Sequence, residues 1–96
     1  MERSSEKKIG SILQVFLRSN NLKQGYLEYK ITKAWSEVLG KQIDAATRSL
    51  FVKDRKLFVK LHSSVVRNEL SMLKQDLIIR LNEHVGEVVI DDIVLR

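Results

Sequence analysis

The spacing of apolar residues changes along this chain from a helical to a strand-like period, and that change limits the folds open to it. Between residues 47 and 62 apolar side chains alternate with polar ones, and β-branched and aromatic residues are frequent. Before and after this stretch, apolar residues recur at the three- and four-residue spacing typical of helices. A polar break at residues 53–56 divides the alternating stretch. We therefore predict a β-hairpin with helices on either side of it in the sequence.

The number of residues in the hairpin loop decides which side chains share a face of the sheet. An even-numbered loop, either Asp54-Arg55 or residues 53–56, turns the apolar residues of both strands to the same side. Both loops predict the same opposed pairs, Val52 with Leu57 and Phe51 with Phe58. The predicted inward face holds Leu50, Val52, Leu57, Val59 and Leu61. The predicted outward face holds Thr47, Ser49, Phe51, Lys53, Lys56, Phe58, Lys60 and His62.

Two apolar stripes with helical spacing precede the hairpin. The first predicts a helix over residues 5–19 that ends at Asn20-Asn21. The second begins near Leu27 and includes Trp35, and Gly40 stands where a left-handed cap would end the helix.

A third helix and a final strand are predicted after the hairpin. Ser63 or Ser64 is a suitable N-cap and Gly86 a suitable C-cap. The helix between them is predicted to bury Val66, Leu70, Leu73, Leu77, Ile78, Leu81 and Val85. Residues 88–96 are rich in β-branched residues but are interrupted by Asp91-Asp92, which predicts a strand with a bend or bulge. The expected molecule is thus one α+β domain over residues 1–96, with the order α-α-β-β-α-β.

Composition argues against several classes of protein. The chain has no cysteine, which excludes disulfides, thiolate zinc sites and cysteine nucleophiles. No apolar run approaches the roughly 20 residues that span a bilayer, so we expect a cytoplasmic protein without membrane contact. The two histidines, His62 and His84, have no metal-binding spacing, and no glycine-rich phosphate loop is present. We expect no enzyme, no cofactor, no metal and no small-molecule substrate.

Positive charge is concentrated in the middle of the sequence. The net charge is +3 over residues 1–40, +4 over residues 41–61 and −2 over residues 62–96. Local clustering of charge determines surface potential, so the basic middle favours either a polyanion-binding face or an ordinary solvated surface.

A set of short motifs lies in a fixed order from residue 35 to residue 96: Trp35 with Val38-Leu39-Gly40, Leu57-Phe58-Val59, Ser63-Ser64, Glu69-Leu70 with Leu73, Leu81-Asn82, Gly86, and Ile93-Val94-Leu95-Arg96. In this order and spacing the stretch resembles the DciA family. The resemblance implies a KH-like α+β fold with a small three-stranded sheet and helices mainly on one face. It also implies a non-enzymatic protein that engages the replicative helicase DnaB and helps to place it on DNA.

Two features of this sequence depart from the family's pattern. Family hairpins typically have a glycine in the turn, whereas this one has Asp54-Arg55-Lys56. Many members also carry a long basic extension beside the domain, and the sequence here ends at Arg96. The G-x-x-G loop of RNA-clamping KH domains is absent too, which argues against that mode of binding.

The outward face of the predicted hairpin is the candidate nucleic-acid site. Phe51 and Phe58 would stand side by side among lysines, an arrangement that suits stacking with the bases of a single strand. Alternatively the two rings form a cross-strand pair partly buried under the first helix. The residues proposed for nucleic acid are Lys41, Arg48, Phe51, Lys53, Arg55, Lys56, Phe58 and Lys60.

Three aromatic residues are candidates for contact with a protein partner. Trp35 lies on an apolar stripe, which favours a place in the core, although tryptophan is also common at binding hot spots. Tyr26 and Tyr29 lie off the stripe and suit exposed contacts. The leading hypothesis is a helicase recruiter that also binds DNA, and the alternative is a general single-strand-binding module without a dedicated protein partner.

Overall fold

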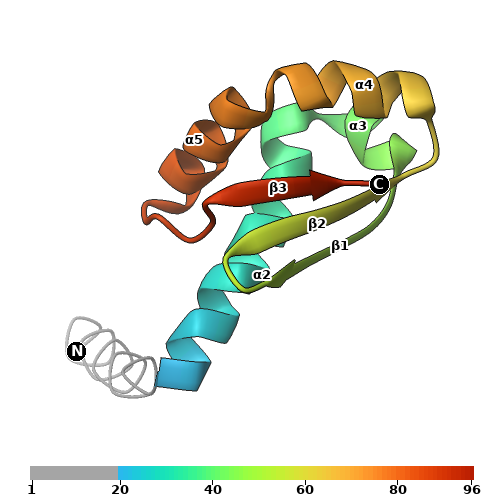
Figure 1. Cartoon of the computed structure of the whole chain (residues 1–96). Coiled ribbons are helices and arrows are strands. Elements are labelled where there is room, and N and C mark those ends of the chain that lie inside the picture. The colour runs from blue at the N-terminus through green and yellow to red at the C-terminus, as the bar shows by residue number, and fades with distance from the viewer. Residues whose placement is uncertain (1–19) are drawn as a thin grey trace, which may run out of the picture.

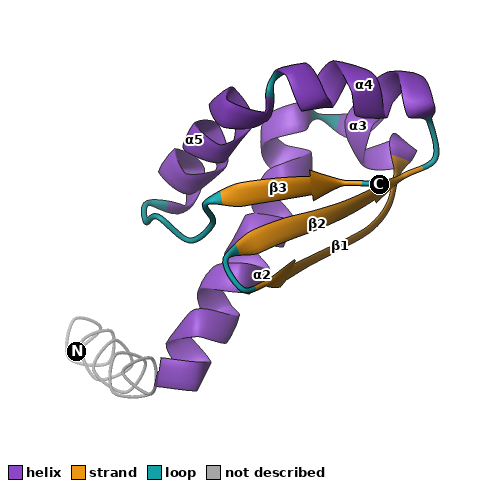
Figure 2. Ribbon diagram, in the orientation of Figure 1, coloured by secondary structure: helices purple, strands orange, loops and turns teal. Residues whose placement is uncertain are grey.

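The computed structural model describes residues 20–96, which form one three-stranded sheet and four helices (Figure 1). In chain order the elements are α2 (Asn20–Leu39), α3 (Lys41–Ala46), β1 (Thr47–Lys53), β2 (Lys56–Leu61), α4 (Ser64–Met72), α5 (Lys74–Val85) and β3 (Asp92–Leu95). The strand order is β1-β2-β3, with β1 and β2 antiparallel and β2 and β3 parallel. The helices pack mainly on one face of the sheet (Figure 2), so the predicted α+β class is confirmed. The helix predicted over residues 5–19 lies outside the described residues.

The hairpin has the predicted register. Phe51 faces Phe58 and Val52 faces Leu57 across the two strands. The loop is the two-residue alternative, Asp54-Arg55, and both residues have positive φ, at 52° and 63°. Positive φ at both central residues is the signature of a type I′ turn, whose twist matches that of the flanking strands. Here the turn forms without glycine.

One end of the hairpin departs from the predicted alternation. The register shifts between Thr47 and Ser49, so that Arg48 is the extra residue of a β-bulge and Thr47 faces Leu61. The prediction that Thr47 points outward opposite His62 is therefore wrong, because the bulge turns its hydroxyl toward the core.

The helices before the hairpin differ from the prediction at two points. Asn20 and Asn21, predicted to end the first helix, are instead helical and belong to α2. Gly40 follows α2 as predicted, but its φ of 87° and ψ of 178° are not those of a left-handed cap. This extended, positive-φ conformation suits glycine alone and lets the chain change direction into the unpredicted helix α3.

The third predicted helix is interrupted at Leu73. Ser63 caps it as predicted, accepting a hydrogen bond from Val66 N, and Gly86 ends it with φ 91°. Between them the Leu73 amide donates to Leu70 O, three residues back rather than four. This tighter turn separates α4 from α5 and rotates Leu73 out of the apolar stripe. Leu73 is consequently 52% exposed. The prediction that Leu73 belongs to the core is therefore wrong.

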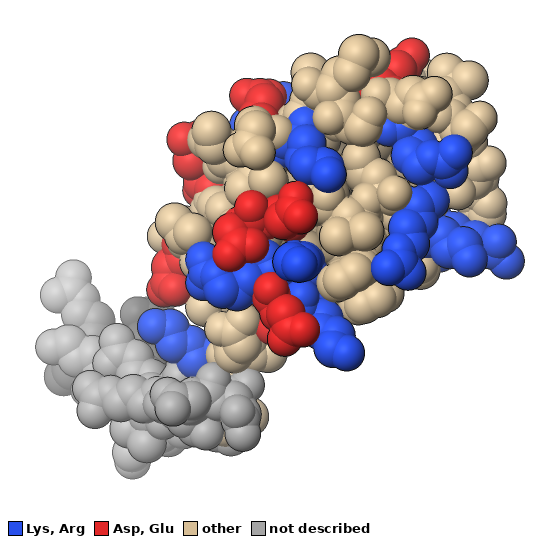
Figure 3. All heavy atoms as spheres, viewed as in Figure 1, with Lys and Arg blue, Asp and Glu red and all other residues tan. Residues whose placement is uncertain are grey.

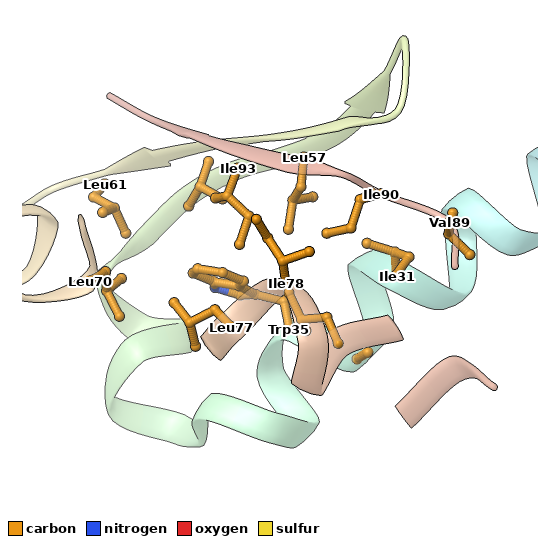
Figure 4. Packing of buried hydrophobic residues seen from close by; sticks show 13 residues of the cluster. Ile31, Trp35, Leu57, Leu61, Leu70, Leu77, Ile78, Val89, Ile90 and Ile93 are labelled. Carbon is orange, nitrogen blue, oxygen red and sulfur yellow. The ribbon is translucent and has the colours of Figure 1, made fainter. Parts of the chain in front are cut away.

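The core lies between the helices and the inner face of the sheet. Its fully buried large side chains are Trp35, Ile31, Leu57, Leu77, Leu81, Ile90, Ile93 and Val59. Figure 4 shows Trp35 in this layer, with Leu77 and Ile78 beside it and Leu57 and Ile93 reaching from the sheet. The Trp35 Nε1 donates to Thr47 Oγ1 at 2.9 Å, which joins α2 to the first residue of β1.

The last segment contains the predicted bend, but it is a strand only over Asp92–Leu95 and not over residues 88–96 as predicted. The bend falls at Asp91, and strand β3 begins at the next residue. The Asp91 amide donates to Arg55 O, which ties the start of β3 to the hairpin turn. Because β3 lies parallel to β2, its alternate residues extend both faces of the hairpin.

Candidate nucleic-acid interface

The sheet face turned away from the helices is a continuous surface of polar, basic and aromatic side chains. We call it the open sheet face, defined by Ser49, Phe51, Lys53, Lys56, Phe58, Lys60, Asp92, Val94 and Arg96. Strand alternation places these residues together, because their neighbours Leu57, Val59 and Ile93 are buried on the other side. Ser49, Phe51 and the three lysines are exposed.

Phe51 and Phe58 form a parallel stack at the centre of the open sheet face. Their ring centroids are 4.8 Å apart and their planes differ by 6°. Arg96 adds a third layer, with its guanidinium carbon 5.5 Å from the Phe58 centroid. The predicted side-by-side pair is thus present, and an arginine accompanies it as a cation–π partner.

The basic residues at the turn end of the hairpin lie close to carboxylates. Arg55 Nε is 3.3 Å from Asp91 Oδ2. Lys56 is paired in register with Asp92, whose Oδ1 also lies 3.9 Å from Lys74 Nζ. Nearby carboxylates lower the positive potential that the sequence alone predicts for this end.

The opposite end of the open sheet face is more strongly basic. Arg48 lies near the start of β1, Lys60 lies near the end of β2, and Arg96 follows β3. The backbone of Arg96 bonds to that of Val59 and Leu61, which fixes it at this end. Within residues 20–96 no carboxylate forms an ion pair with any of these three cations. Figure 3 shows Lys and Arg grouped over this end of the sheet, and Asp and Glu mixed with them near the turn.

The structure assembles most of the predicted nucleic-acid residues and adds one. Phe51, Phe58, Lys53, Lys56 and Lys60 share the open sheet face. Arg55 and Arg48 border it at the turn and at the bulge. Lys41 is exposed at the first residue of α3, and no described contact brings it onto this face. Sequence reasoning missed Arg96. Its two-residue spacing from Val94 places both on the same face of β3, and the parallel pairing of Val94 with Phe58 then brings Arg96 near Phe58.

The model of one protein family, described as "Dna[CI] antecedent, DciA", matches residues 8–95. The match covers every described element. The chain belongs to the DciA family. This confirms the predicted resemblance and extends it toward the N-terminus. Membership in the DciA family supports a function associated with DNA replication. A search of curated proteins found no match.

The DciA-family chain presents a second aromatic surface on the outer side of its helices. Tyr26 and Tyr29 are exposed on α2, and each ring has a lysine over it, with Lys30 Nζ 5.2 Å and Lys33 Nζ 5.9 Å from the respective centroids. They border a hollow of about 330 Å³ between α2 and the end of α5. Trp35 is fully buried, which confirms the core position that its apolar stripe favours, so its ring offers no exposed surface to a partner.

An apolar groove lies beside α5 in this DciA-family chain. It has a volume of about 580 Å³, and Ile79 and Val88 are its most exposed apolar side chains. Glu83, Glu87 and Asp91 line it as well. A surface with these carboxylates disfavours nucleic acid, because the phosphates carry the same charge.

The two histidines lie apart from the open sheet face or at its margin. His84 Nε2 is 3.3 Å from Glu37 Oε2, an exposed contact between α5 and α2. His62 follows β2 and donates its backbone amide to Ala46 O. Among residues 20–96 no cluster of His, Asp and Glu has a metal-binding arrangement, and no helix is long and apolar enough to cross a membrane.

Proposed function

We propose that this DciA-family protein is a non-enzymatic replication adaptor that binds the DnaB helicase and DNA and promotes helicase loading. The observation that carries the proposal is the separation of two surfaces. The open sheet face has the charge and the aromatic rings that suit nucleic acid, whereas α2 and α5 carry exposed aromatic and apolar side chains on the other side of the sheet. An adaptor needs two surfaces that can be occupied at the same time.

The open sheet face suits single-stranded DNA better than duplex DNA. Its cations can contact phosphates of either form, since that interaction is independent of base sequence. Its stacked rings interact only with bases that are exposed, and in a duplex the bases already stack on one another. We therefore assign the phosphate contacts to the cations at the Arg48, Lys60 and Arg96 end, and the base contact to the aromatic stack.

The tyrosine surface on α2 is the proposed contact for the helicase. Tyrosine is enriched at protein interfaces because its ring buries a large area while its hydroxyl stays hydrogen-bonded. Tyr26 and Tyr29 are held on a helix whose opposite side carries Ile31 and Trp35 in the core. The core thus fixes the orientation of the two rings without contributing atoms to the interface.

Binding of the purified protein to DnaB from the same organism, measured without DNA, tests the proposal. We expect association at micromolar concentrations and low salt, together with an increase in the amount of DnaB retained on single-stranded DNA. The binding step is carried out without nucleotide, and we expect DnaB to bind there too, because recruitment should need no nucleotide hydrolysis by this chain. Binding to single-stranded DNA with no detectable association with DnaB would reject the adaptor and favour the general single-strand-binding module.

A further inference from the structure

The two stacked phenylalanines are not equivalent, because they belong to different strands. Phe58 is on β2, the central strand, and has a partner on each side. The Phe51 ring stacks on one face of the Phe58 ring, with the two centroids 4.8 Å apart. The Arg96 guanidinium lies over the Phe58 ring, 5.5 Å from its centroid. Because Phe51 comes from β1 and Arg96 follows β3, these partners approach from opposite sides. Phe58 therefore has no face left for a ligand.

Phe51 has one aromatic partner, and among residues 20–96 no ring or cation stacks on its other face. It lies on β1, which is an edge strand, so no strand of the described sheet lies beyond it. Its side chain is 49% exposed, although Phe58 stacks on it. Lys53, two residues along the same strand, supplies a cation beside the ring.

We propose that the face of the Phe51 ring opposite Phe58 is the stacking site for a single nucleobase of single-stranded DNA. The inference rests on the proposed DNA binding and makes it more specific. The base continues the existing stack, so that the order across the sheet becomes base, Phe51, Phe58, Arg96. Phe58 and Arg96 lie behind the Phe51 ring in this order, so the base contacts Phe51 alone. The cations of the open sheet face then bind the phosphates on either side.

A stack that a base can extend at only one end differs from two rings lying flat on a sheet in the number of bases it can bind. It accepts one base, and it accepts any base, because every base has a flat aromatic surface. Duplex DNA cannot use the site without opening, whereas an abasic strand can still bind through its phosphates alone.

The experiment compares the affinity of a dT oligonucleotide with that of an abasic strand of the same length, about 12 nucleotides, which falls within the site sizes of single-strand-binding domains. We expect the wild-type protein to prefer the dT strand by roughly 5- to 150-fold, the range that stacking of one base supplies. Phe51→Leu should remove this preference and leave the affinity for the abasic strand unchanged. Leucine keeps an apolar side chain at this position, so thermal unfolding should confirm that the fold is intact.

Phe58→Leu is the matched control. It removes a ring of the same chemistry from the next strand, and we expect it to retain most of the preference for bases. An unchanged preference in Phe51→Leu, or an equal loss in both variants, would overturn the assignment to Phe51. A wild-type protein that binds both strands equally would also overturn it while leaving DNA binding intact. Binding to neither strand would instead reject the proposed DNA-binding function itself.

Discussion

Asn82 and Ile90 exchange two hydrogen bonds through one side-chain amide: Nδ2 donates to Ile90 O at 2.8 Å, and Oδ1 accepts from Ile90 N at 3.1 Å. The same Oδ1 accepts from Val89 N at 2.9 Å. Asn82 is the one buried polar residue among the described part of the chain, at 8% exposure. Its amide fixes the loop after α5 and so determines where β3 joins the sheet.

Asn82→Ala should therefore destabilise the protein strongly. The substitution leaves two backbone amides and a carbonyl without partners in a buried place, and we expect the free energy of unfolding to fall by about 2 to 5 kcal/mol. Chemical denaturation measures this change. Asn68→Ala, on the exposed side of α4, is the control and should have little effect. If the two variants were equally stable, the loop would not depend on the amide of Asn82.

Leu77→Ala and Leu73→Ala should differ, although the sequence pattern treats the two leucines alike. Leu77 is 1% exposed, so its truncation leaves a cavity that costs about 2 to 5 kcal/mol of unfolding free energy. Leu73 lies at the break between α4 and α5 and is half exposed, and its truncation should cost less than about 1 kcal/mol. Urea denaturation of both variants measures the difference. Equal losses would mean that α4 and α5 form one continuous helix in solution.

Neutralising the end of the open sheet face that carries Arg48, Lys60 and Arg96 should weaken the salt dependence of DNA binding. The triple variant Arg48→Gln, Lys60→Gln, Arg96→Gln removes three cations that have no described carboxylate partner. If each contacts a phosphate, the slope of log K against log salt falls by about 2 in magnitude on single-stranded DNA. Titrations at several salt concentrations give this slope.

The matched variant at the turn is Lys53→Gln, Arg55→Gln, Lys56→Gln. It removes the same formal charge, but Arg55 is paired with Asp91 and Asp92 lies beside Lys56. We expect a smaller change in slope than in the triple variant of Arg48, Lys60 and Arg96. A larger change at the turn would show that these carboxylates do not reduce the attraction of the turn for phosphates.

Tyr26→Ala combined with Tyr29→Ala should weaken binding to DnaB by tenfold or more, because a hot-spot tyrosine typically contributes above about 1 kcal/mol. DNA binding should be unaffected, since the open sheet face lies on another side of the molecule. Val65→Ala combined with Met72→Ala removes exposed apolar surface from α4 and serves as the control. A folded tyrosine variant with full affinity for DnaB would exclude this surface and leave recruitment itself untouched.

The register of the hairpin near its turn could be predicted because its determinants are local. The even loop and the alternation of apolar residues together specify that Phe51 faces Phe58, whatever the rest of the chain does. The bulge at Arg48 could not be predicted in this way. It arises where Thr47 turns inward and its hydroxyl accepts a hydrogen bond from the Trp35 indole N–H. This contact joins two different elements, and the alternation of apolar residues along one strand does not predict it.

The charge of the candidate site was harder to predict for the same reason. Arg55 counts as a free cation in the sequence, yet its partner Asp91 comes from a segment 36 residues later. Arg96 was missed because only the parallel pairing of β3 with β2 brings it over Phe58. The break at Leu73 was also unpredictable, since neither proline nor glycine marks it.

The edge position of β1 gives its basic residues a role that does not involve DNA. An edge strand exposes unpaired backbone amides and carbonyls, and a second sheet can pair with them. Lysines and bulges on edge strands oppose such pairing, and β1 has both, with Lys53 at one end and the Arg48 bulge at the other. Variants that neutralise this strand are therefore expected to self-associate through their sheets, so a loss of soluble monomer would report an unprotected edge rather than a lost ligand.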